Sequence, residues 1–473
     1  MKVPESEIRY SPLSLVDIGR VFFWQGRLFR GISGDSVPAV QKMFECGLVA
    51  RLVSEHLLVN SWLTDLQLEG YGLVVEHEVV PVTTYPREWS FSMLRDAALL
   101  VLRLNEIAIS YGYQTKDCNG YNVLFGSGGP VFVDLGSFVE VRTRADLLLS
   151  YKEFLRSYYY PLQMWRSGGQ YLGGRVAPRA LALLCAPEAY LRYRWPFFRW
   201  FNGTTISRAW KTLCSIRTLQ HNSLDNTTVR LSPWEIRILV QLRKTRLFSR
   251  PARISVLSHK LRKLPSASSG STWADYHDEF SRDAVPITTN RFDYVATKLS
   301  ELDVETVLEL AGNQGVLSRT LKRRSGHVRV TCTDMDAIAI DKGYQAARDA
   351  REDIYWAVLN PFAFEGSAIE RPPEQRFRAD AVVVLALTHH LTLTQNFRLD
   401  YVFDVIAGYA KRYVLVEFMP LGLFDGTSAP SVPDWYNEAW FLKGFTCKFV
   451  LVERIQLEPN RILFVGSTTT ASP

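Results

Sequence analysis

The chain has 473 residues, of which 47% are hydrophobic and 22% charged, so its composition is that of a globular protein with more than one core. No apolar run approaches the roughly 20 residues that a membrane-spanning helix needs, and the opening sequence MKVPESEIRY lacks the apolar core of a secretory signal. The six cysteines are scattered without a Cys-x-x-Cys pair, which argues against a zinc site. We therefore expect a cytoplasmic protein with reduced thiols.

The net charge of +7 is unevenly distributed. Residues 188–263 contain sixteen Lys and Arg against three acids, a local charge of +13, which leaves −6 for the rest of the chain. Such a basic region favours an anionic partner, either a phosphorylated substrate or a membrane surface touched peripherally, although a solvated helical face explains it equally well. No nucleic-acid-binding signature accompanies it, so we expect no nucleic-acid partner.

The N-terminal third predicts a small strand-rich lobe followed by a long helix. Residues 19–32 indicate two strands around a Gln-Gly turn, and residues 37–58 have helical spacing of apolar side chains. Residues 73–80 indicate another strand, and an apolar helix covers residues 97–110 before Gly112.

A pattern of acids and an amide follows that helix. Asp117 is followed by Asn122, a Gly-Ser-Gly-Gly-Pro turn and then Asp134-Leu135-Gly136. This pattern, and the order of elements before it, resembles the catalytic and metal-binding loops of the protein-kinase-like fold. The resemblance implies that Asp117 orients or deprotonates an acceptor hydroxyl, and that Asn122 and Asp134 hold Mg²⁺ on the phosphates of ATP.

The kinase pattern is incomplete. Thr115-Lys116 stands where the family has His-Arg, the glycine-rich loop is unrecognisable and no strand lysine stands out, although Arg27 or Arg30 could replace it. Three interpretations stay open: a hairpin with structural aspartates, a degenerate kinase fold without phosphotransfer, and an active small-molecule kinase.

A domain boundary follows. Residues 142–263 are mostly helical in pattern, and residues 265–272 (PSASSGST) have the small polar composition of a linker. We predict a kinase-like α+β domain over residues 1–264 with a basic helical lobe, and a second domain over residues 273–473.

The second domain begins its sheet with the most informative motif of the chain. Residues 306–310 (TVLEL) are typical of a strand buried in a parallel sheet, and a turn containing Gly312 and Gly315 follows. After a helix over residues 316–324, the strand of residues 328–333 ends in Asp334, nineteen residues beyond Gly315. An acid at that distance in a βαβ unit is placed to bind ribose hydroxyls, whereas the missing Gly-x-Gly-x-x-Gly and phosphate loop disfavour pyrophosphate.

The sequence LELAGNQG of residues 308–315 resembles the first motif of class I S-adenosylmethionine (SAM) methyltransferases. The resemblance implies that the cofactor is held by six residues: Glu309, Ala311, Gly312, Asn313, Gly315 and Asp334. Two of the family's glycines are Ala311 and Asn313 here. A Rossmann-like sheet without a cofactor is the alternative.

The remaining strands complete an α/β sheet. Strands are expected at residues 354–359, 379–387 and 412–416, the last ending in Glu417, and two more at 447–456 and 461–466. The last two are separated by only four residues, too few for a parallel crossover, so they form an antiparallel hairpin. A parallel sheet ending in such a hairpin resembles the seven-stranded, Rossmann-like domain of class I methyltransferases.

His389 and His390 follow the fourth strand, at the mouth of the expected cleft. Either imidazole could be the base that deprotonates a hydroxyl acceptor, or both could simply cap a helix or pack on the cofactor. Glu417 could likewise bind substrate or cap a helix.

Pieces of both halves together, including Lys116-Asp117, residues 312–315 and Leu387–Leu391, resemble the bacterial class I methyltransferases that include the NoeA-like nodulation proteins. That family implies a SAM-dependent methyltransferase acting on a small-molecule, glycolipid or secreted-metabolite acceptor. A bifunctional kinase and methyltransferase, or a degenerate scaffold that binds an anionic partner, are the alternatives.

Overall fold

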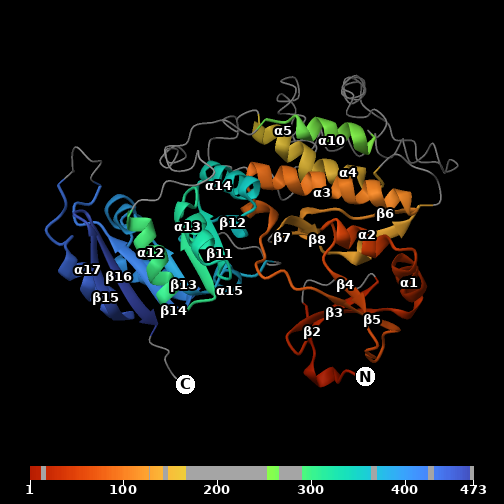
Figure 1. Cartoon of the computed structure of the whole chain (residues 1–473), viewed down its shortest axis with the longest axis horizontal. Coiled ribbons are helices and arrows are strands. Elements are labelled where there is room, and N and C mark those ends of the chain that lie inside the picture. Colours follow the sequence, from red (N-terminus) through yellow and green to blue (C-terminus); the bar gives the residue numbers. More distant parts are fainter. Residues whose placement is uncertain are drawn as a thin grey trace, which may run out of the picture.

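The computed structural model describes residues 1–11, 18–126, 128–141, 148–166, 253–265, 290–363, 370–423 and 431–468. The two halves lie side by side, with the chain termini on different halves (Figure 1). Residues 266–272 of the predicted linker and most of the basic region 188–263 lie outside the described residues.

The N-terminal half begins with a five-stranded antiparallel sheet of order β1-β2-β3-β5-β4. The predicted hairpin forms through β2 and β3, whose Gln25-Gly26 turn has positive φ at both residues, as a two-residue turn of this kind requires. Two helices separate β3 from β4. The bounds are β1 Arg9–Tyr10, β2 Gly19–Trp24, β3 Arg27–Ile32, α1 Val37–Glu45, α2 Leu48–Ser54, β4 Ser61–Leu63 and β5 Leu73–His77.

A long helix, α3, follows the sheet and is the axis of this half (Figure 1). The structure extends it beyond the predicted start, because Ser90 accepts a hydrogen bond from the Met93 N–H and so caps it six residues earlier. Two short hairpin-like pairs and three helices surround it. The bounds are α3 Phe91–Ser110, β6 Tyr113–Thr115, β7 Val123–Gly126, β8 Gly129–Phe132, β9 Phe138–Glu140, α4 Tyr151–Phe154, α5 Tyr160–Arg166 and α10 Ile254–Arg262.

The C-terminal half contains the seven-stranded sheet that the sequence predicts. Its order is β12-β11-β10-β13-β14-β16-β15, with parallel pairing as far as β14 and antiparallel pairing of β16 with both neighbours. The strands are β10 Thr306–Leu310, β11 Arg329–Asp334, β12 Ile354–Val358, β13 Ala379–Val384, β14 Ala410–Phe418, β15 Phe449–Glu458 and β16 Arg461–Thr468.

Helices cover both faces of this sheet, since the central strands are buried on both sides. Val307 belongs to the core shared with one group of helices, whereas its neighbour Leu308 belongs to the core shared with the other group. The first group is α12 Asn290–Glu301, α13 Val316–Arg324 and α14 Ala337–Ala350, and the second is α15 Pro373–Arg376, α16 Leu399–Tyr409 and α17 Glu438–Thr446. The predicted α/β, Rossmann-like architecture of this half is therefore confirmed.

The two halves share one continuous apolar core and several buried polar contacts. The core that contains Leu94 and Val101 of α3 also contains Val316 and Val330 of the second half. Glu88 of the N-terminal half is 3% exposed, and its Oε1 accepts a hydrogen bond from Arg376 Nη2 of the C-terminal half at 2.5 Å. A buried guanidinium is stable only with such a partner, so these contacts hold the halves together.

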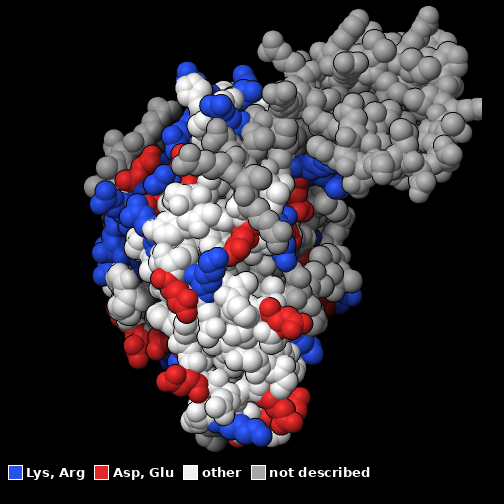
Figure 2. Space-filling view, turned by 90° about the vertical axis from the view of Figure 1, so that its right-hand side faces the viewer, with Lys and Arg blue, Asp and Glu red and all other residues white. Residues whose placement is uncertain are grey.

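No helix among the described residues is long and apolar enough to cross a membrane. The face seen from the right-hand side of Figure 1 carries acidic and basic side chains among large uncharged areas (Figure 2). Most of residues 188–263 lie outside the described residues, so binding of an anionic partner by this basic region stays a prediction.

Candidate functional site

The candidate cofactor site lies where β10, β11 and β13 end. β10 pairs in parallel with β11 on one side and with β13 on the other. The strands after β10 are therefore added on one side of it as far as β12, and from β13 onward on the other side. In open α/β sheets this switch point creates a crevice at the carboxyl ends of the strands. Three predicted features meet at this edge. The glycine turn follows β10, Asp334 is the last residue of β11, and the segment before His389 follows β13.

The turn after β10 has a left-handed backbone at alternate positions. Ala311, Asn313 and Gly315 have φ values of 57°, 52° and 68°. Asparagine tolerates this region, whereas alanine adopts it only under strain. The two residues that replace the family's glycines therefore take up conformations that glycine favours, and the turn keeps a glycine-like shape.

Gly312 and Gly315 are required because the backbone of the turn lies very close to side chains of the neighbouring strands. A Cβ on Gly312 would lie 2.6 Å from Cys332 Sγ and 2.7 Å from Glu309 Cδ, and a Cβ on Gly315 would lie 2.4 Å from the Trp356 ring. Contacts this short do not occur for real side chains, so the turn is pressed against β11 and β12.

Asp334 holds this turn from the neighbouring strand. Its Oδ2 accepts the Asn313 N–H at 2.8 Å, and its Oδ1 accepts the Asp336 N–H at 2.8 Å. Asp336 in turn caps α14 by accepting the N–H groups of Ile338 and Ala339. The acid predicted to bind ribose is thus 8% exposed and oriented from both sides.

Glu309 is buried beneath the turn. Its Oε2 accepts the Ser318 N–H at 3.1 Å and the Ser318 Oγ–H at 2.5 Å, which caps the first turn of α13. Burial, partly offset by those two hydrogen bonds, raises the pKa of Glu309 to about 7. Its visible role is to fix the glycine turn onto α13.

His389 and His390 lie beyond β13, with ring centroids 4.1 Å apart. Burial, His390 and the Arg461 guanidinium lower the pKa of His389 to about 3, so its imidazole is neutral at physiological pH. Burial also lowers the pKa of His390, which is only half-buried. Of the two, His390 is therefore the better placed to exchange a proton with a solvent-accessible group.

Glu417 joins the ends of β13 and β14. Its side chain is fully buried and its Oε2 accepts the Ala386 N–H and Arg461 Nη1, both at 2.8 Å. Arg291 Nη1 lies 3.6 Å from its Oε1. Arg291 and Arg461 could not be recognised as site residues from the sequence. Arg291 precedes the motif strand and Arg461 opens the last strand, so both lie far from the histidines in sequence.

The second candidate site lies in the N-terminal half, after α3. Asn105 of α3 hydrogen-bonds both the backbone and the hydroxyl of Thr115, which fixes the strand that leads to Asp117. The Asp117 carboxylate accepts the Asn119 N–H at 3.0 Å. Burial and the Asp117 charge raise the pKa of the nearby Glu153 to about 7.

Asn122 and Asp134 come together at Ser137, which donates to Asp134 Oδ2 and lies 3.4 Å from Asn122 Nδ2. Asp134 Oδ1 accepts the Gly136 N–H at 3.1 Å and Arg30 Nη2 at 2.9 Å. In the part of the chain that the structure describes, no group of three or more His, Cys, Asp or Glu side chains is arranged to hold a metal ion. The two predicted Mg²⁺ ligands are thus close together, but the Asp134 carboxylate already forms a salt bridge with Arg30.

No family model matches the sequence, but a curated protein is similar to most of the chain. The chain is 25% identical over 427 residues to nodulation protein NoeA of Rhizobium meliloti (strain 1021), which covers 85% of this chain and 83% of NoeA. The chain is therefore a distant relative of NoeA. A match over 85% of the chain includes parts of both halves.

Solved methyltransferase structures resemble part of the chain. An O-methyltransferase family protein from Burkholderia thailandensis is 15% identical, with a TM-score of 0.31 over 42% of this chain and 59% of that chain. The chain thus spans less than two thirds of that protein. A SAM-dependent methyltransferase from Clostridium acetobutylicum is 10% identical, with a TM-score of 0.31 over 41% of this chain and 97% of the other. The Rossmann-like fold of the C-terminal half follows from its strand order.

We predict that Glu309 makes stability depend on pH between about 4.5 and 7. Because the folded state holds its proton up to about pH 7 and the unfolded state releases it near 4.5, stability falls as pH rises through this window. A shift of this size corresponds to roughly 3 kcal/mol. Glu309→Gln keeps an acceptor for Ser318 but cannot ionise, so it should gain stability relative to the wild type from pH 5 to pH 8.

The measurement is urea unfolding at four pH values between 5 and 8. Glu305→Gln, at the exposed position just before β10, is the control for the substitution itself. Parallel pH curves for the wild type and Glu309→Gln would show that Glu309 is ionised in the folded protein at neutral pH.

Proposed function

We propose that the chain is a SAM-dependent methyltransferase whose cofactor binds at the carboxyl edge of β10 and β11. The observation that carries the proposal is the left-handed turn 311–315 held against the Asp334 carboxylate at the switch point of the sheet. The order of the sheet, with a single antiparallel hairpin at its end, supports the same family of folds.

The residues at this edge fit such a cofactor. Gly312 and Gly315 bring the backbone of the turn close to the sheet, and the N-terminus of α13 directly follows the turn. Asp334 is an acceptor for ribose hydroxyls, while Glu309 supports the turn from below. Ala311 and Asn313 would contribute backbone groups. When bound, SAM supplies the electrophilic methyl group.

The acceptor is proposed to enter beside His390. A methyl acceptor must be aligned with the cofactor, and a hydroxyl acceptor must also lose a proton. Next to His389 lies a cluster of one carboxylate, Glu417, and two guanidinium groups, Arg291 and Arg461. This cluster provides negative and positive charge that could orient a polar acceptor. We propose a small molecule or a glycolipid as that acceptor.

The cofactor assignment predicts that the full-length protein binds SAM and S-adenosylhomocysteine in isothermal calorimetry. Asp334→Ala should weaken binding by about tenfold or more, because a hydrogen bond to a charged group contributes about 1.5–3 kcal/mol. Asp400→Ala, a carboxylate paired with Arg398 on the surface of α16, is the control. If the folded wild type does not bind SAM at millimolar concentration, the proposal fails.

The base assignment predicts that His390→Gln reduces methyl transfer by about 10²–10⁴-fold while SAM affinity changes little. His389→Gln should have a smaller effect, because the pKa of His389 lies too low for a proton acceptor at neutral pH. Products are measured in cells fed methyl-labelled methionine by comparing labelled metabolites with and without each variant. Less than a tenfold loss in His390→Gln would point to catalysis by alignment alone.

For the N-terminal half, we propose a kinase-like fold that lacks phosphotransfer. Support comes from the five-stranded lobe, the long helix, and the loop and hairpin that carry Asp117, Asn122 and Asp134 in kinase order. Arg30 on β3 forms a salt bridge with Asp134. The same carboxylate also accepts hydrogen bonds from the Ser137 hydroxyl and the Gly136 N–H. In this arrangement the residues do not fit a bound Mg²⁺, since a metal would have to displace the guanidinium.

This second proposal predicts that ATP with Mg²⁺ or Mn²⁺ leaves the melting temperature of the full-length protein unchanged. Asp134→Asn, which removes one charge from the Arg30 pair, should give the same null response to nucleotide. A metal-dependent stabilisation by ATP that Asp134→Asn abolishes would instead support a nucleotide site and the bifunctional alternative.

A further inference from the structure

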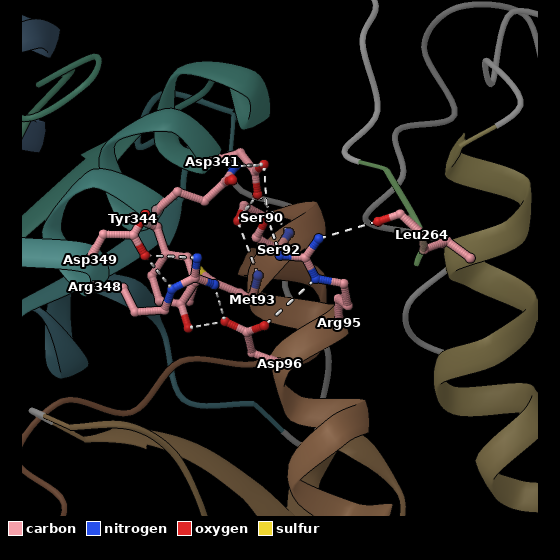
Figure 3. Close-up of polar contacts among 11 residues, drawn as sticks. Ser90, Ser92, Met93, Arg95, Asp96, Leu264, Asp341, Tyr344, Arg348 and Asp349 are labelled. Atoms are coloured by element: carbon pink, nitrogen blue, oxygen red, sulfur yellow. Dashed lines mark hydrogen bonds and ion pairs between the residues drawn. The ribbon is translucent and has the colours of Figure 1, made fainter. Parts of the chain in front are cut away.

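Helix α14 touches both the N-terminal half and the candidate cofactor turn. It begins at Ala337, three residues after Asp334. Its residues Asp341, Tyr344 and Arg348 follow one another at the spacing that places side chains on one helical face. Figure 3 shows that these side chains point toward the start of α3, which belongs to the other half.

The central contact of this interface is a carboxylate that binds the N-terminus of a helix. Asp341, 6% exposed, accepts the Ser90 Oγ–H at 2.6 Å, the Ser92 N–H at 2.6 Å and the Ser92 Oγ–H at 3.1 Å. Ser90 is the residue that caps α3, so the negative charge lies at the positive end of that helix. Ser90 and Ser92 are fully buried, so water cannot replace the carboxylate there without a rearrangement.

Two further side chains of α14 extend the contact along α3. Tyr344 donates its hydroxyl to Asp96 Oδ2 at 3.0 Å, and Arg348 Nη1 lies 2.8 Å from the same oxygen (Figure 3). The Tyr344 ring also packs edge-on against Phe125 of β7, with centroids 6.0 Å apart. One face of α14 is thus fixed to the N-terminal half by three side chains over about two helical turns.

The opposite side of α14 is pressed against the cofactor turn. A Cβ on Gly343 would lie 2.7 Å from the backbone oxygen of Gln314 and 2.5 Å from the Trp356 ring. The same ring leaves no room for a Cβ on Gly315. Trp356 therefore lies between α14 and the turn, and a shift of the helix must move the turn or the ring.

The N-terminus of α14 is also connected to Asp334. Asp336 caps the helix, and its own N–H is donated to the Asp334 carboxylate. Asp341 lies five residues farther along, about 7.5 Å in helical rise. The contact with α3 is thus little more than one helical turn from Asp336, which is hydrogen-bonded to the acid proposed to bind ribose.

We infer that the N-terminal half is a structural part of the cofactor site, and that Asp341 is a positioning residue which sets the turn 311–315 and Asp334 through α14. The effect on cofactor affinity rests on the proposed function, whereas the effect on the turn does not. The coupling between the two halves is reciprocal, so cofactor binding also stabilises the α3 contact.

The test compares Asp341→Ala, Asp341→Asn and the double variant Ser90→Ala with Ser92→Ala in the full-length protein. The double variant removes two of the three donors from the N-terminal side without changing the methyltransferase domain. Asp404→Ala on α16, whose carboxylate pairs with Lys448 at the surface, is the matched control. Two quantities are measured: amide hydrogen exchange over residues 311–318, and the dissociation constant of SAM from the folded protein.

We expect Asp341→Ala and the serine double variant to speed exchange of the turn and to weaken SAM binding by about fivefold or more, the lower end of coupling between sites. Asp341→Asn keeps an acceptor oxygen and should restore part of both effects, whereas Asp404→Ala should match the wild type. Unchanged exchange in Asp341→Ala and in the serine variant, with only a lower melting temperature, overturns the inference. If the wild type binds no SAM, the proposed function fails while hydrogen exchange still decides the positioning role.

Discussion

The hydrogen bond from the Asn313 N–H to the Asp334 carboxylate is the contact on which the candidate site depends. It closes a turn that runs through three left-handed residues, and one of them, Ala311, adopts that conformation at an energetic cost. The same carboxylate accepts an N–H from the start of α14. One buried side chain therefore holds together the turn, the second strand and the helix that any ligand at this edge would contact.

The described parts of the two halves are packed together through buried contacts. The apolar core continues from one half to the other, and Arg376 reaches back to Glu88 at a buried position. Removing one partner of such a pair leaves an uncompensated buried charge, which typically costs about 3–5 kcal/mol. The N-terminal half therefore contributes to the stability of the C-terminal half.

Much of the cofactor edge could be predicted from the sequence, because local signals determine it. The buried strand, the turn and the acid of the next strand lie within thirty residues, and β10 and α13 have the predicted bounds. Contacts between distant residues could not be predicted. Nothing near Asp341 indicates that it binds the first turn of α3, and the salt bridge from Arg30 to Asp134 depends on how the strand lobe packs on the hairpin.

The most direct test of cofactor binding at this edge is the structure of the full-length protein with S-adenosylhomocysteine bound. We expect ribose hydroxyls within hydrogen-bonding distance of Asp334, with the backbone of the turn 311–315 around the rest of the cofactor. A ligand bound in the N-terminal half, or one at the sheet edge that leaves Asp334 untouched, would contradict this expectation.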